Sequence, residues 1–156
     1  MLIRKAENKD ADKIIVLLTQ VLNIHAKIRP DIFIPGTTKY TRPELYEMFT
    51  DEKRPIYVAV DENDEVIGYA FCVIKEQPFS TNMVPFTSLF IDDLCVDEKR
   101  RGEHIGGALF EYVKEQAKSL GCYEVTLNVW EGNDSAKAFY DKLGFKPKET
   151  QLEYIL

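Results

Sequence analysis

The sequence predicts a mixed α/β fold in which helices flank a sheet that is not purely parallel. Three observations support this prediction. An apolar strand pattern in residues 86–96 leads through a glycine-rich turn directly into a helical pattern. The apolar stretches 56–60 and 66–74 are joined by the acidic turn 61–64, which is typical of an antiparallel hairpin. Strand and helix patterns follow one another roughly in the order β-α-α-β-β-β-α-β-α-β.

The N-terminal part predicts one strand and one helix. Residues 2–5 form a short strand pattern, and Asn8 is the expected N-cap of a helix that continues to about Leu22. The buried stripe of this helix recurs at helical spacing and consists of Ile14, Ile15, Leu18, Val21 and Leu22.

Two segments have less regular patterns, residues 23–54 and residues 77–85. In the first, Thr41-Arg42-Pro43-Glu44 predicts a capping box that opens a short helix through Phe49. The second, which includes Pro78 and Phe79, is expected to be a loop before the central strand. Each segment can line a binding pocket or serve as a plain connection, and the sequence leaves both open.

The C-terminal third predicts a helix, a strand, a second helix and a last strand. The first helix ends at Gly121. Strands are expected at residues 125–130 and 151–155, and Asn133 is the expected N-cap of the helix between them. The apolar face of the first helix consists of Ile105, Ala108, Leu109, Tyr112, Val113, Ala117 and Leu120.

Length and composition indicate one domain, residues 1–156, in a reducing compartment. The 156 residues suffice for a single core, and the net charge of −6 argues against a nucleic-acid partner. No apolar run approaches the ~18 residues of a membrane span, and no signal segment opens the chain. Cys72, Cys95 and Cys122 are widely spaced and show no metal-ligand pairing, so we expect no metal site and a cytoplasmic location.

The glycine-rich turn predicts an anion site, because the first turn of a helix presents free N–H groups and glycines let a phosphate come close. Its spacing matches neither the P-loop nor the dinucleotide fingerprint. The run Arg101-Gly102-Glu103-His104-Ile105-Gly106 instead resembles the pyrophosphate loop of the GCN5-related N-acetyltransferase (GNAT) superfamily, Arg/Gln-x-x-Gly-x-Gly/Ala. His104 stands where the family usually has glycine, and histidine tolerates a positive φ while keeping its backbone N–H.

A second block strengthens the resemblance. Residues 125–145 are similar to the family's strand, asparagine and helix ending Phe-Tyr-x-x-Leu-Gly-Phe. The resemblance covers residues 56–150 well and residues 1–22 loosely. It implies a mostly antiparallel twisted sheet, splayed between its fourth and fifth strands, and transfer of acetyl from acetyl-CoA to a primary amine. The matching positions are Asn133, Ala136, Phe139, Tyr140, Leu143, Gly144 and Phe145.

The resemblance also implies which residues bind acetyl-CoA. The pyrophosphate would lie on the backbone around Gly102, His104, Gly106 and Gly107, with Arg101 nearby. The pantetheine arm would pair with the backbone of one strand, whose N–H groups would polarise the thioester carbonyl. Asn133 is the usual pantetheine contact. The full set of expected cofactor residues is Leu94, Cys95, Val96, Arg101, Gly102, Glu103, His104, Ile105, Gly106, Gly107, Asn133 and Tyr140.

Direct transfer to an amine needs a base for the ammonium proton and an acid for the leaving thiolate. Tyr140 matches the family's usual acid. Asp92 and Asp93 interrupt an apolar strand, where unpaired carboxylates are costly, and strand alternation is expected to point them to opposite faces. Polyamine and related acetyltransferases have an acid at the place of Asp92, which makes it the candidate base. A structural salt bridge is the alternative for this pair.

Other candidates have a weaker basis. Cys95 has no histidine placed to activate it, so it is expected to be a small core residue. His25 can orient an acceptor or act as a base, or be an ordinary surface residue. The acceptor is expected to be a small amine, a polyamine, an amino sugar or a protein amine, and a homodimer is possible. A non-catalytic acyl-CoA-binding sensor is the alternative function.

Overall fold

The structure is a computed structural model that describes residues 1–77 and 80–156. Pro78 and Phe79, which belong to the expected loop before the central strand, lie outside the described residues. The elements in chain order are β1 (Leu2–Lys5), α1 (Ala11–Ile28), α2 (Arg42–Met48), β2 (Ile56–Val60), β3 (Val66–Glu76), β4 (Thr87–Val96), α3 (Ile105–Ser119), β5 (Glu124–Leu127) and α4 (Asp134–Lys142).

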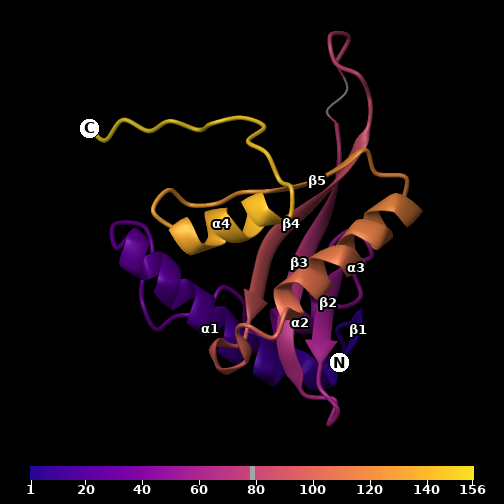
Figure 1. Ribbon diagram of the computed structural model, residues 1–156, viewed down its shortest axis with the longest axis vertical. Helices are drawn as coiled ribbons and strands as arrows, with labels where there is room; N and C mark the ends of the chain where they lie inside the picture. The colour runs from indigo at the N-terminus through magenta and orange to yellow at the C-terminus, as the bar shows by residue number, and fades with distance from the viewer. Residues whose placement is uncertain (78–79) are drawn as a thin grey trace.

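The strands form one sheet in the order β1-β2-β3-β4-β5. All neighbours are antiparallel except β4 and β5, which are parallel. The predicted mixed, mostly antiparallel sheet is therefore confirmed. Figure 1 shows α3 across one face of the sheet, with α1 and α2 against the other and α4 beside β5.

Each face of the sheet has its own apolar core. On the α1 and α2 face, the buried side chains include Ile14, Leu17, Leu45, Tyr69 and Phe71. On the α3 face they include Tyr57, Leu89, Ile91, Phe110 and Val113. Neighbouring strand residues supply opposite cores, as the two-residue repeat of a strand requires.

A β-bulge interrupts the pairing of β3 with β4. Ile91 is opposite Cys72 and Asp93 is opposite Phe71, so Asp92 is an additional residue with no partner on β3. A bulge breaks the alternation of side chains along its strand. The expectation that Asp92 and Asp93 point to opposite faces is therefore wrong, because it assumed a regular strand.

Several predicted element boundaries are corrected. The N-cap position of the first helix is occupied by Asp10 rather than Asn8, because residues 8–10 form a short 3₁₀ turn. It continues to Ile28, beyond the expected end at Leu22, since nothing in residues 23–28 stops a helix. The strand β5 ends at Leu127 instead of residue 130, where its pairing with β4 stops.

The expected last strand at residues 151–155 is absent, and residues 146–156 form an extended segment that we call the C-terminal tail. The tail has no backbone hydrogen bond to residues 1–77 or 80–145. In Figure 1 it runs past α4 and away from the domain. A strand needs a partner for its backbone groups, and the described part of this chain supplies none to the tail.

Candidate functional site

The second half of β4 has a free edge. Its pairing with β5 covers only residues 88–91, opposite residues 124–127. Beyond the bulge, β4 continues to Val96 and, within residues 1–77 and 80–156, pairs only with β3. Leu94, Cys95 and Val96, expected to contact the cofactor, therefore lie on an unpaired strand edge. Such an edge can bind an extended ligand as an added strand.

The glycine-rich turn brings the start of α3 to the end of this edge. His104 is the N-cap residue, with φ of 61° in the left-handed region, and no side chain caps the helix. Gly102 also has a positive φ, 87°. The first turn of α3 contains no acidic residue, so its N–H groups and the helix dipole favour an anion. The loop geometry thus accommodates histidine where the family usually has glycine.

Two adjacent glycines in α3 face different surroundings. A methyl group on Gly106 would lie 3.0 Å from Cζ of Phe139, so the first turn of α3 packs directly against α4. A methyl group on Gly107 would meet no atom within 4 Å. The first glycine therefore brings α4 close to the turn, while the second leaves room outside the helix.

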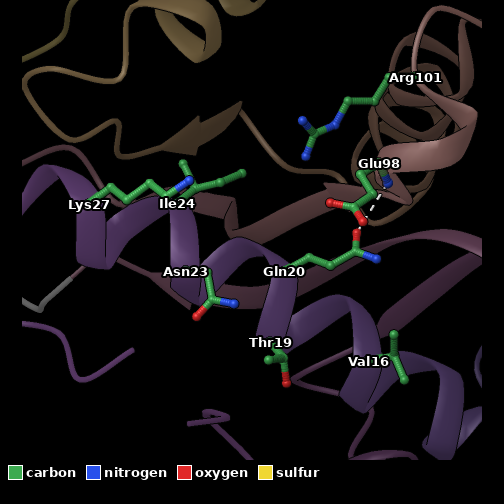
Figure 2. Close-up of a pocket in the computed structure, with 8 residues that line it drawn as sticks. All are labelled: Val16, Thr19, Gln20, Asn23, Ile24, Lys27, Glu98 and Arg101. Carbon is green, nitrogen blue, oxygen red and sulfur yellow. Dashed lines mark hydrogen bonds between the residues drawn. The ribbon is translucent and has the colours of Figure 1, made fainter. Parts of the chain in front are cut away.

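A cleft of about 620 Å³ lies between α1 and the turn that follows β4. Figure 2 shows Arg101 and Glu98 on one side of this cleft and α1 side chains along the other. The Gln20 side-chain oxygen accepts a hydrogen bond from the Glu98 backbone N–H at 3.1 Å. The cleft is lined by Val16, Thr19, Gln20, Asn23, Ile24, Lys27, Glu98 and Arg101.

The sequence did not predict that side chains of α1 line this cleft. The sequence does contain a pattern that is consistent with such a wall. Gln20, Asn23 and Lys27 recur three and four positions apart on the side of α1 away from the apolar stripe. Most polar helix faces, however, do no more than contact water. The positions of Glu98 and Arg101 across the cleft distinguish this face from a solvated one.

The two acids of β4 have different partners. Asp92 forms an ion pair with the Lys39 ammonium at 2.6 Å, with 28% of its side chain exposed. Asp93 accepts a hydrogen bond of 2.7 Å from the hydroxyl of Tyr69, which belongs to the core on the α1 face. The salt-bridge alternative thus describes Asp92, and the second acid is the one that points into the domain.

Burial sets the protonation of this inner group. Loss of water raises the pKa of Asp93 to about 6, although the Tyr69 hydrogen bond acts in the opposite direction. Burial also raises the pKa of Tyr140, and the Asp93 carboxylate raises it further. Near neutral pH the site therefore contains an ionised carboxylate with a pKa close to neutrality and a phenol that keeps its proton.

The remaining candidates have structural roles in the fold. The Asn133 side chain caps α4 by accepting a hydrogen bond of 3.4 Å from the Ala136 N–H. Cys95 is buried, and burial raises the pKa of its thiol to about 12, so it carries no thiolate at neutral pH. His25 is half-buried and its ring lies 5.3 Å from that of Phe33, which in turn contacts Trp130.

Residues 1–77 and 80–156 contain neither a candidate metal cluster nor a candidate membrane-spanning helix. No group of three or more histidine, cysteine, aspartate or glutamate side chains there could hold a metal ion. No helix in the same ranges is long and apolar enough to cross a membrane. Cys72, Cys95 and Cys122 are free thiols.

Comparison with known proteins agrees with this geometry. The sequence profile of the acetyltransferase (GNAT) family matches residues 18–145. A glucosamine 6-phosphate N-acetyltransferase from Arabidopsis thaliana is 29% identical, over 96% of this chain and 93% of its own. A peptidyl-lysine N-acetyltransferase, YjaB, from Salmonella typhimurium is 27% identical, over 92% of this chain and 82% of its own.

A crystal structure has a very similar fold. A mutant of the BH1408 protein from Bacillus halodurans is 33% identical and superposes with a TM-score of 0.95. The alignment covers 100% of this chain and 99% of the other. The C-terminal tail is therefore included in the part that aligns.

We expect Asp93→Asn to stabilise the folded protein at pH 8. The pKa of Asp93 rises from 3.8 to about 6 on folding, so its contribution favours folding below about pH 4 and is lost as the pH rises through about 6. Asparagine carries no charge, and its side-chain oxygen can still accept the hydrogen bond from the Tyr69 hydroxyl. The expected gain in the free energy of unfolding is ~1–3 kcal/mol at pH 8 and close to zero at pH 4.

Urea denaturation of wild type and variant at both pH values measures this difference. Asp92→Asn is the matched control, because an exposed ion pair contributes under ~1 kcal/mol. A loss of stability in Asp93→Asn at pH 8 would contradict the assigned environment.

Proposed function

The chain belongs to the GNAT acetyltransferase family, and on this premise we propose that it moves acetyl from acetyl-CoA to a primary amine by direct attack. Acyl transfer from acetyl-CoA to an amine is the activity of this family and of the relatives named above. One observation carries the proposal for this chain. The free edge of β4 begins at the glycine-rich start of α3 and ends beside Asp93, which acts electrostatically on Tyr140.

We propose that the two ends of this edge bind different parts of acetyl-CoA. The pyrophosphate would lie on the backbone of residues 102–107, with the Arg101 guanidinium across the cleft from α1. The pantetheine arm would pair with the backbone of residues 94–96 and contact Asn133. The open space outside Gly107 supports this arrangement, because a ligand can approach the helix there.

For the chemical step we propose Asp93 as the base and Tyr140 as the acid. A base works best with a pKa near the working pH, and the pKa of Asp93 is about 6. The amine nitrogen forms a bond to the acetyl carbon, its proton passes to the Asp93 carboxylate, and the carbon–sulfur bond breaks. Tyr140, whose raised pKa keeps it protonated, donates a proton to the leaving thiolate.

Asp92, the base expected from the sequence, suits a different task in this proposal. It is partly exposed and already binds one ammonium group, that of Lys39. The same Lys39 charge also lowers the pKa of Asp93, so the two carboxylates face a common region. We propose that Asp92 holds the incoming ammonium of the acceptor before Asp93 removes a proton from it.

The acceptor is proposed only as a class. The relatives are named for an amino sugar phosphate and for protein lysine, and both carry a primary amine. Paired carboxylates attract any such cation without choosing between a small molecule and a peptide.

We also propose a cytoplasmic location, because free thiols suit a reducing compartment, and a homodimer, which the exposed C-terminal tail supports.

We expect acetyl-CoA to bind the purified protein in a calorimetric titration and to release thiol when the matching amine is added. A panel of amino sugars, polyamines, small amines and lysine peptides then identifies the acceptor. Gly107→Glu is the control variant, since its side chain has room but brings a negative charge to the phosphate site. It should fold and bind at least about tenfold more weakly. Binding without thiol release would favour a non-catalytic sensor, and no binding would contradict the proposal.

Tyr140→Phe should lower kcat by about 10²-fold or more while leaving the acetyl-CoA dissociation constant within a factor of about three, because only the proton donor is lost. Tyr123→Phe is the matched control, since that side chain is 75% exposed on the surface. The two variants are compared by steady-state thiol release and by calorimetry. An unchanged kcat in Tyr140→Phe would remove this residue from the mechanism.

The assignment of the base predicts a pH dependence. In wild type, kcat/KM should rise with pH and level off above about pH 6, as the Asp93 carboxyl loses its proton. Asp93→Asn should abolish this rise and lower the rate by about 10²-fold or more. Asp92→Asn should instead raise KM for the amine and keep the rise. If the two variants behaved in the opposite way, the roles of the two acids would be exchanged.

A further inference from the structure

The Lys39 ammonium holds the position on Asp92 that we assign to the ammonium of the acceptor. We propose that Lys39 is a site of self-acetylation, at which the chain transfers acetyl from acetyl-CoA to the Nζ atom of its own Lys39 while no external amine is bound. This inference rests on the acetyl transfer proposed above. It names a lysine of the chain itself as one acceptor of that reaction.

The Lys39 ammonium lies at the bulge of β4. Its Nζ atom is 2.6 Å from a carboxylate oxygen of Asp92, and 48% of the Lys39 side chain is exposed. Burial lowers the pKa of His25, and the Lys39 charge lowers it further. Against the larger effect of burial, the same charge lowers the pKa of Asp93. One amine nitrogen is thus bound by the outer acid of the bulge and lies within electrostatic reach of the inner one.

The loop before α2 holds Lys39 in this position. The next residue, Tyr40, stacks on Phe71, with ring centroids 5.6 Å apart and an interplanar angle of 13°. Phe71 is opposite Asp93 in the pairing of β3 with β4, so this anchor belongs to the same part of the sheet as the bulge. Thr41 then opens α2 with its capping box. The backbone is therefore fixed directly after Lys39, and its side chain is directed to the two acids.

The acid and the base of the proposed mechanism both act on this amine site. Burial lowers the pKa of Lys39, but Asp92 and Asp93 raise it more, so the group is an ammonium ion that needs a base before it can attack. Burial raises the pKa of Tyr140, and the Asp93 carboxylate raises it further. Asp93 is therefore within electrostatic reach of the amine and of the phenol that would protonate the leaving group.

The transfer balances without a further reactant. The Lys39 Nζ atom loses one proton to the Asp93 carboxylate and forms a bond to the acetyl carbon. The carbon–sulfur bond breaks, the thiolate takes the proton of Tyr140, and the second proton that leaves the nitrogen restores the phenol. The products are an acetyllysine, CoA and one proton on Asp93. Because the amide is neutral, it no longer pairs with Asp92, which is then free to bind an external ammonium.

Mass spectrometry of the full chain, before and after incubation with acetyl-CoA alone, tests the proposal. We expect one acetyl group per chain, which proteolytic fragments should locate on Lys39. Lys118 is the internal control, because it pairs with Glu115 but is 64% exposed, so simple chemical acetylation would label it at least as readily. Lys39→Arg should keep the ion pair and lose the label, since a guanidinium keeps its proton. A label spread over exposed lysines would overturn the proposal.

Two further comparisons test whether the chain itself performs the transfer. Tyr140→Phe should slow labelling of Lys39 by about 10²-fold or more, and should lack any acetyl that wild type acquires during expression. The first-order rate constant of labelling in wild type should not depend on protein concentration, because donor and acceptor are held in one chain. Equal labelling of Tyr140→Phe, or a rate constant proportional to protein concentration, would overturn transfer within the chain.

An external amine separates this inference from the function on which it rests. If wild type releases thiol with an amine of the panel while Lys39 stays unmodified, self-acetylation is wrong and the proposed function stands. If acetyl-CoA does not bind, both are wrong.

The release of Asp92 is measured by the KM for that amine. Lys39→Gln, which lacks the charge as acetyllysine does, should have a KM about fivefold lower than Lys39→Arg, which keeps the ion pair. Equal KM values in the two variants would contradict the competition between Lys39 and the acceptor for this carboxylate.

Discussion

One additional residue in β4 determines how the site is built. Asp92 has no partner on β3, so the side chains before and after it change faces. Ile91 packs toward α3, whereas Asp93 bonds to Tyr69 on the α1 face. The parallel pairing with β5 stops at the residue before the bulge. The same irregularity therefore opens a free strand edge and turns a carboxylate inward beside it.

The two carboxylates at the bulge differ in exposure and in the partners of their charge. Asp92 is partly exposed and neutralised by Lys39, which makes it an ordinary surface ion pair. Burial raises the pKa of Asp93 to about 6, although the Tyr69 hydroxyl, the Lys39 charge and the Leu94 backbone N–H all act in the opposite direction. A charge held in such a place weakens folding, and in the proposed mechanism the same burial gives the base a pKa near neutrality.

In the C-terminal third, elements that form one wall of the site also lie at the surface of the domain. Gly106 brings α3 against Phe139 of α4, so the helix with Asn133 at its start and Tyr140 near its end is placed by contact with the glycine-rich turn. The same helix contains no buried residue, and the strand before it is only partly covered.

Local patterns in the sequence determined most of the elements and the cofactor turn. The helical spacing after residue 105, the capping box at Thr41, the acidic hairpin and the Asn133 cap all depend on neighbours a few positions away, and the structure contains each of them. His104 at positive φ also follows from local sterics. Tertiary structure alone decided the rest. The bulge, the Lys39 and Tyr69 partners of the two acids and the α1 wall of the cleft join residues tens of positions apart. The tail has the local pattern of a strand, but a strand exists only where another segment meets its backbone hydrogen bonds, and no local pattern specifies which segment that is.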